Sequence, residues 1–179
     1  MRADPASPQA QIQRFLGAYP PPLQTQILDL VQRDKLAEHL ARKYPERHHI
    51  QSDAALYDYT QRLKQRYLKS TPPVHKVVWK DKMDVMQNVL GLHTAISRVQ
   101  GGRLKAKAEI RIAGLFKTAA PAFLEMVVVH ELAHLRERAH NKAFYQLCQH
   151  MQPDYHQVEF DLRLLLLQRA LEGRPGHAP

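Results

Sequence analysis

Cysteine is nearly absent from this chain, and its scarcity narrows the kinds of metal site that the chain can build. Cys148 is the single cysteine in 179 residues, so no disulfide can form within the chain. Its place beside Leu147 in a helical pattern predicts a buried thiol rather than a nucleophile. Structural zinc sites favour cysteine, so we expect any metal site here to use histidine, of which there are 11. One unpaired cysteine also favours a cytoplasmic location.

Long apolar runs, glycine-rich loops and acidic clusters are missing as well. No stretch approaches the roughly 20 apolar residues of a membrane span, so we expect no membrane partner. The polar start from Met1 to Gln13 lacks the apolar core of a secretory signal. No glycine-rich phosphate loop and no acidic cluster of the kind that binds magnesium is present, which argues against a nucleotide hydrolase.

Positive charge is abundant: 26 Lys and Arg against 17 Asp and Glu give a formal net charge of +9. This balance favours anionic partners such as nucleic acid, nucleotides or acidic protein segments. The basic residues gather in the middle of the chain, at Arg62, Lys64, Arg66, Lys69, Lys76, Lys80, Lys82, Arg98, Arg103, Lys105, Lys107, Arg111 and Lys117. We expect them to form a basic surface through which a nucleic acid or nucleotide could bind.

Apolar spacing predicts a helical segment over residues 1–73 that packs on the rest of the protein. Helices are expected over 9–17 and 24–44, and a third should begin after Ser52 as its N-cap and end before Ser70. Strands are expected from residue 74 on, over 76–79, 92–97 and 103–112. Gly101 and Gly102 are a two-residue turn signal, so an antiparallel hairpin should join the last two strands.

His130, Glu131 and His134 form the pattern His-Glu-x-x-His. On a helix, residues four apart lie on the same face, so His130 and His134 can offer both imidazoles to one metal ion. The apolar run over 123–129 predicts that this helix is buried, with Pro121 in its first turn. Glu131 is placed to act as a general base, and His140 is the candidate third ligand. One Zn²⁺ suits three histidines and an open position.

The chain resembles the bacterial YgjP-like metallopeptidase family, which is related to WLM and SprT-like zincins. The resemblance is carried by residues 129–135, 140–145 and 149–155, and it covers about 74–167. Residues 90–94 depart from the Trp-Gly-Ser-Cys-like segment of many members, which puts their substrate preferences in doubt for this chain. The resemblance implies an α+β, zincin-like fold: N-terminal helices, a small antiparallel sheet with a hairpin, the active-site helix and C-terminal helices. The metallohydrolase domain should span 74–172, followed by a flexible tail over 173–179.

The implied mechanism is hydrolysis by a zinc-activated water, whose pKa zinc lowers to about 7, with Glu131 as the base. Tyr145, Tyr155 and His156 are candidates for stabilising the transition state, and no choice among them follows from the sequence. Asn141 should cap the helix after His140. Two acidic residues of the C-terminal helix, Glu159 and Asp161, could hydrogen-bond the ligands, but a solvent-exposed face is the stronger expectation for both.

Three functions remain open at this stage, and a zinc metallopeptidase is the leading expectation. A metallopeptidase would bind a peptide or protein along an edge strand, whose basic residues would be Arg103, Lys105, Lys107 and Arg111. A nucleotide hydrolase is the second, because members of the family have been assigned pyrophosphatase activity on nucleoside triphosphates such as UTP. The third is a nucleic-acid-associated binding module with structural zinc, which would need a fourth protein ligand such as His150.

Overall fold

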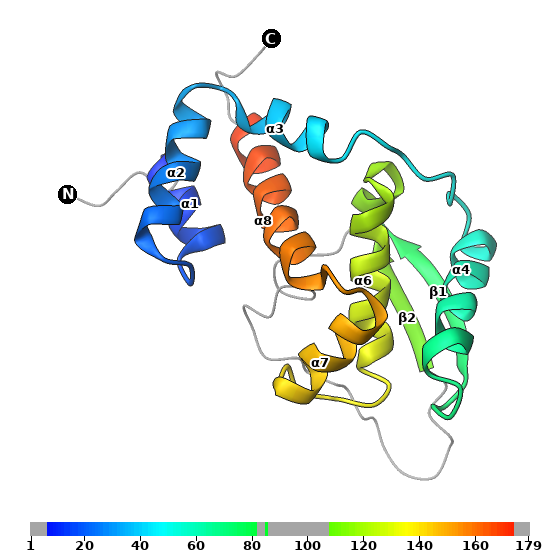
Figure 1. The fold of residues 1–179 in the computed structure, drawn as a ribbon. Coiled ribbons are helices and arrows are strands. Elements are labelled where there is room, and N and C mark those ends of the chain that lie inside the picture. The colour runs from blue at the N-terminus through cyan, green and yellow to red at the C-terminus, as the bar shows by residue number, and fades with distance from the viewer. Residues whose placement is uncertain (1–6, 82–84, 86–107, 174–179) are drawn as a thin grey trace. The chain divides into compact units, whose positions relative to one another are not determined.

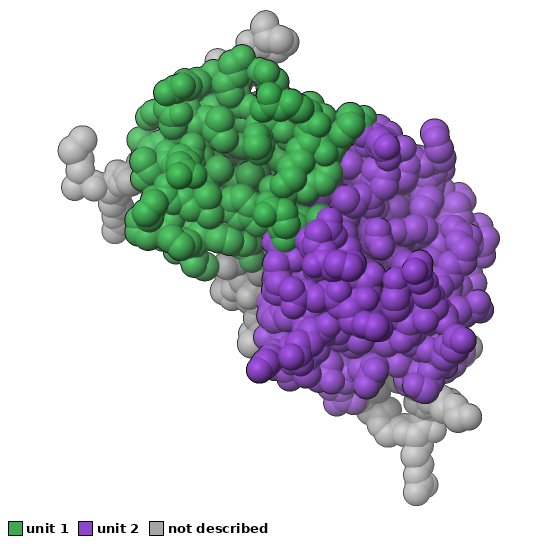
Figure 2. Space-filling view, viewed as in Figure 1, with its two compact units in different colours: residues 1–45, 157–179 green, residues 46–156 purple. Residues whose placement is uncertain are grey.

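The computed structural model describes residues 7–81, 85 and 108–173 (Figure 1). Two compact units make up the chain: residues 1–45 with 157–179, and residues 46–156 (Figure 2). The fold is α+β, as the sequence predicts, because the described residues are mostly helical and include one small sheet. The division at residue 73 into an N-terminal segment and a catalytic domain stays a prediction.

The first unit is helical. It contains α1 (Pro8–Leu16), α2 (Pro21–Gln32), α3 (Leu36–Lys43) and most of α8 (Tyr155–Glu172). The prediction of one helix over 24–44 is wrong, because the chain breaks between α2 and α3 at Asp34, where φ is 54°. Aspartate tolerates this left-handed conformation better than most residues, and a helix cannot pass through it.

The second unit contains the sheet and the predicted motif helix. Its elements are α4 (Asp53–Tyr67), β1 (Val74–Lys80), β2 (Ala108–Ala113), the 3₁₀ turn η1 (Gly114–Thr118), α6 (Pro121–Ala133) and α7 (Lys142–Met151). Ser52 is the N-cap of α4, as predicted, and its hydroxyl accepts a hydrogen bond from the Ala55 N–H. Both α4 and α6 pack on the two-stranded sheet (Figure 1).

The sheet corrects one prediction. Strands β1 and β2 pair in parallel, with Val77 opposite Ile110 and Trp79 opposite Ile112, whereas an antiparallel arrangement was expected. Parallel strands cannot be joined by a tight turn, and β1 ends at Lys80 whereas β2 begins at Ala108. The predicted strand over 92–97 and the turn at Gly101 and Gly102 lie outside the described residues. In β2 the expected alternation holds, since Ile110 and Ile112 are buried and Arg111 is exposed.

Helix α6 is buried over most of its surface and carries the His-Glu-x-x-His pattern at its carboxyl end. Pro121 occupies its first turn, as predicted. Its buried side chains are Phe123, Leu124, Met126, Val127, Val128, Val129, His130, Leu132 and Ala133. A helix packed by apolar neighbours holds its polar residues in fixed positions. Across the described residues, no helix is both long and apolar enough to cross a bilayer.

Candidate metal centre

His130 and His134 lie one turn apart at the end of α6. His130 is only 1% exposed, and His134 is the C-cap, whose N–H donates to the carbonyl of His130. The helical spacing therefore places both imidazoles on one face of α6, as the sequence predicts.

A series of turns brings His140 back to these two rings. After Ala133 the chain leaves the helix through hydrogen bonds from the N–H groups of Arg136 and Glu137 to the Ala133 carbonyl. Asn141 then begins α7: its side-chain oxygen accepts from the Phe144 N–H at 2.9 Å, which confirms the predicted N-cap. His140 precedes this cap directly, so the start of α7 fixes its backbone.

The three histidines converge through the same ring nitrogen. Nε2 of His130 lies 3.2 Å from Nε2 of His134 and 3.2 Å from Nε2 of His140, and the last two nitrogens are 3.1 Å apart. Three nitrogens bound tetrahedrally to zinc at 2.0–2.1 Å would be separated by about 3.3 Å. The spacing of the three nitrogens thus fits one metal ion. Among the described residues, no fourth histidine, cysteine or carboxylate joins the group.

Burial keeps these rings neutral in the metal-free protein. It lowers the pKa of all three histidines, and it lowers the pKa of His130 the most, with neighbouring His134 and His140 adding to the effect. For His134, a hydrogen bond to the Glu137 carbonyl partly offsets this lowering of the pKa. Neutral imidazoles are the form that binds metal, so a proton competes weakly for this site at neutral pH.

Phe144 supports all three rings from one side, a role that the sequence analysis missed. Its own ring is fully buried, and its centroid lies 5.0 Å from that of His130 and 4.7 Å from those of His134 and His140. The only sequence signal for it was an apolar aromatic shortly after the third histidine. Packing of this kind limits how far the imidazoles can rotate.

Glu131 follows His130 on α6 and is partly exposed. Desolvation by the surrounding protein raises the pKa of its carboxyl group to about 7. A carboxyl group that titrates near neutral pH can both accept and return a proton under working conditions.

The structure separates the three residues that the sequence left equivalent. Tyr155 is fully buried, and its hydroxyl lies 2.8 Å from Nδ1 of His130. Tyr145 is half-buried with its ring 6.4 Å from that of His140, and the ring of exposed His156 lies 5.3 Å from that of Tyr145. Tyr145 therefore borders His140 on a side that solvent reaches, and exposed His156 lies against Tyr145, while Tyr155 is buried against His130.

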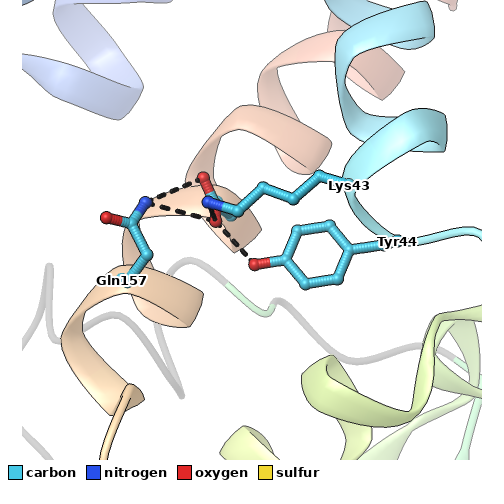
Figure 3. Close-up of polar contacts among 4 residues, drawn as sticks. Lys43, Tyr44 and Gln157 are labelled. Carbon is cyan, nitrogen blue, oxygen red and sulfur yellow. Dashed lines mark hydrogen bonds and ion pairs between the residues drawn. The ribbon is translucent and has the colours of Figure 1, made fainter.

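Several other candidates lie elsewhere. The ring of His150 meets Tyr67 at 5.6 Å and does not join the three histidines. Glu159 and Asp161 are 9% and 1% exposed, so the expectation of a solvent-exposed face is wrong for both. Asp161 instead binds Lys43, Tyr44 and Gln157 within the first unit (Figure 3).

The basic edge-strand candidates are only partly described. Arg111 is exposed on β2 and pairs with Glu109 at 2.9 Å. Arg103, Lys105 and Lys107 lie outside the residues that the structure describes.

Comparison with known proteins places this site in a family. The model of the YgjP-like, metallopeptidase domain matches residues 23–164. The chain is 54% identical over 157 residues, 88% of its own length and 94% of the relative's, to a protein of Escherichia coli (strain K12) named UTP pyrophosphatase. No solved structure matches significantly. A family model covering most of the chain and a relative of this similarity agree with the converging histidines, and the chain therefore belongs to the YgjP-like family of metal-dependent hydrolases.

Proposed function

We propose that this protein is a zinc-dependent pyrophosphatase of nucleoside triphosphates, with UTP as the first substrate to test. The observation that carries the proposal is the 54% identity, over nearly the full length of both chains, to the protein named UTP pyrophosphatase. The converging Nε2 atoms of three neutral histidines support the hydrolytic part of it. A net charge of +9 suits a polyanionic substrate. A nucleotide substrate and a single cysteine are both compatible with the cytoplasm.

His130, His134 and His140 would hold the metal through Nε2. Zinc bound there would supply a Lewis acid and lower the pKa of a bound water to about 7. The donor set fits this ion, since imidazole nitrogen is a preferred zinc ligand and three protein ligands leave one position open. The same donor set argues against the structural-zinc module, because closed sites normally use four protein ligands.

Glu131 would move the proton. Its carboxylate oxygen would accept the proton of the attacking water and then pass it to the departing pyrophosphate. Burial raises the pKa of its carboxyl group to about 7 in the metal-free protein, and the positive charge of a bound zinc ion would favour the carboxylate, which is the form that accepts a proton. Tyr145 would face the substrate, since it borders His140 on the solvent side, and exposed His156 lies against Tyr145. Both side chains could donate hydrogen bonds to phosphate oxygens.

A peptidase is the second candidate. The matching family is described as a metallopeptidase domain, and the His-Glu-x-x-His pattern lies on a helix beside a small sheet. Strand β2 pairs with β1, and no other described strand covers its second edge, which a peptide could use. The peptidase ranks second because the relative from Escherichia coli is named for a nucleotide substrate.

The deciding experiment compares substrates on metal-loaded protein. UTP, the other nucleoside triphosphates and an unfolded protein with and without DNA would be assayed, with pyrophosphate, phosphate and peptide release each measured separately. Glu131→Gln, checked for retained metal, is the matched control because it keeps the size of the side chain and removes the base.

Pyrophosphate release from UTP that falls by at least about 100-fold in Glu131→Gln is the expected result. Cleavage of the unfolded protein with the same dependence on Glu131, and no release from nucleotides, would replace the proposal with the peptidase. Activity that survives in Glu131→Gln would show that this residue is not the base.

A further inference from the structure

We propose that Tyr155 is a positioning residue, which fixes the tautomer and orientation of His130 so that Nε2 stays available to a metal. The sequence offers Tyr155 only as a possible stabiliser of the transition state. The inference rests on the proposed metal site but not on the identity of the substrate.

The contact itself is short and buried. The hydroxyl of Tyr155 lies 2.8 Å from Nδ1 of His130, and the two residues are 0% and 1% exposed. An imidazole N–H in such a place needs a protein partner, because leaving it without one costs free energy. A tyrosine oxygen can accept this hydrogen bond. With the ring proton held on Nδ1, the lone pair of Nε2 points toward His134 and His140.

The fold holds Tyr155 in place through the turn between α7 and α8. The backbone N–H of Tyr155 donates to the Gln152 carbonyl, and the backbone N–H of Gln152 donates to the Cys148 carbonyl. The side-chain nitrogen of buried Gln152 also donates to the carbonyl of Ala122 at 3.3 Å. Residues 152–155 therefore contact α6 at both Ala122 and His130, which leaves the phenol little freedom to move.

The hydrogen-bond partner of Nδ1 is a side chain for His130 and a backbone carbonyl for His134. Nδ1 of His134 donates to a backbone carbonyl, that of Glu137, which no substitution can remove. His134 is also partly exposed, so water can reach it. His130 is buried, and if the Tyr155 hydroxyl is removed, solvent cannot readily replace it. Tyr155 is thus the side chain whose loss should disturb the candidate ligand most selectively.

The test is metal affinity, measured without any substrate. Zn²⁺ binding by Tyr155→Phe would be compared with that of the unsubstituted protein by competition with a chelator, and Co²⁺ absorption would report the ligand field. Tyr59→Phe is the matched control: it removes a tyrosine hydroxyl from α4 in the same unit, and the charged neighbours of that hydroxyl are Glu125 and Arg62. We expect zinc affinity to fall about 10- to 100-fold in Tyr155→Phe and to stay unchanged in Tyr59→Phe.

A second measurement separates positioning from folding. The ¹⁵N chemical shifts of His130 in the zinc-loaded, unsubstituted protein should show a protonated Nδ1 and a metal-bound Nε2, so this result needs no variant that folds. Unaltered zinc affinity in Tyr155→Phe, or a His130 bound to metal through Nδ1, would overturn the inference alone. Failure of the unsubstituted protein to bind zinc would overturn the metal site as well, and a wrong substrate assignment would leave all of these results unaffected.

Discussion

The backbone carbonyl of Glu137 accepts a hydrogen bond from Nδ1 of His134 at 3.0 Å. A carbonyl can only accept, so the ring proton of neutral His134 is on Nδ1 and the lone pair is on Nε2. That nitrogen lies 3.1 Å from the equivalent atom of His140. Two nitrogen lone pairs at this distance repel each other unless a proton or a cation lies between them, and one zinc ion would bind both.

Removal of either His134 or His140, the two half-buried histidines, should therefore abolish tight metal binding. In His134→Ala and His140→Ala we expect zinc affinity to fall by at least about 100-fold, since even supporting residues of a metal site are worth 10- to 100-fold. Glu137→Ala should keep its zinc, because the backbone makes the hydrogen bond, and His150→Ala should keep it because its ring meets Tyr67. Competition with a chelator measures the zinc affinity of all four variants. A loss of zinc in His150→Ala would point to a fourth protein ligand.

Phe144 should matter to both stability and metal binding. Truncation to alanine removes a fully buried ring, which typically costs about 3–5 kcal/mol of unfolding free energy, and it frees the three imidazoles to rotate. Phe144→Leu should be milder in stability but should still weaken zinc binding, since it fills the volume without a flat surface. Urea unfolding of the metal-free protein measures the first effect and chelator competition the second. Unchanged zinc affinity in both variants would show that the ring only fills space.

The buried carboxylate of Asp161 should stabilise the first unit through Lys43 and Tyr44, each 2.6 Å away (Figure 3). We expect Asp161→Asn to cost about 1–3 kcal/mol, because Lys43 is partly exposed and can be hydrated again. Lys43→Met should cost more than Asp161→Asn, since it leaves a buried negative charge without its cation. Urea unfolding at pH 7 measures both, and Lys35→Met, from an exposed ion pair, should change little. The reverse order of the two costs would contradict this account.

Glu125 should make the protein less stable as pH rises. Burial, and then the negative charge of Asp154, raise the pKa of this carboxyl group above its ordinary value of 4.5, while Arg66 opposes the shift. The folded protein holds the proton more tightly than the unfolded chain does, so this contribution to stability is present below pH 4.5 and is lost as pH rises through the folded-state pKa. Glu125→Gln should therefore raise the midpoint of thermal unfolding at pH 7 and raise it less at pH 4. An equal rise of the unfolding midpoint at pH 7 and at pH 4 would exclude titration of Glu125 as the cause.

Local chemistry predicted the parts of the site that depend on neighbours in sequence. The four-residue spacing of His130 and His134 fixed their common face, and Ser52 and Asn141 were recognised as caps from their side chains alone. These features need only the backbone of one helix. They could be read before any tertiary contact was known.

The parts that depend on distant residues could not be predicted. Alternating polarity in β2 shows which face is buried, but it does not show that β1 lies beside it in parallel. Nor could the sequence show that Tyr155 meets His130, since a hydroxyl at that position has equal reason to face a substrate. Asp161 was misjudged because a charged residue on a helix is usually exposed, and only the structure reveals Lys43 beside it.

The three converging histidines span a short piece of chain, since His130 and His140 are only ten residues apart. Backbone hydrogen bonds and the Asn141 cap already hold the turn between α6 and α7, so capturing a metal would order little more of the chain. The helix that carries His130 is held by its apolar neighbours, with no need of an ion. The protein can thus be synthesised and folded first and receive its metal afterwards, so that supply of the ion can determine when a finished molecule becomes active.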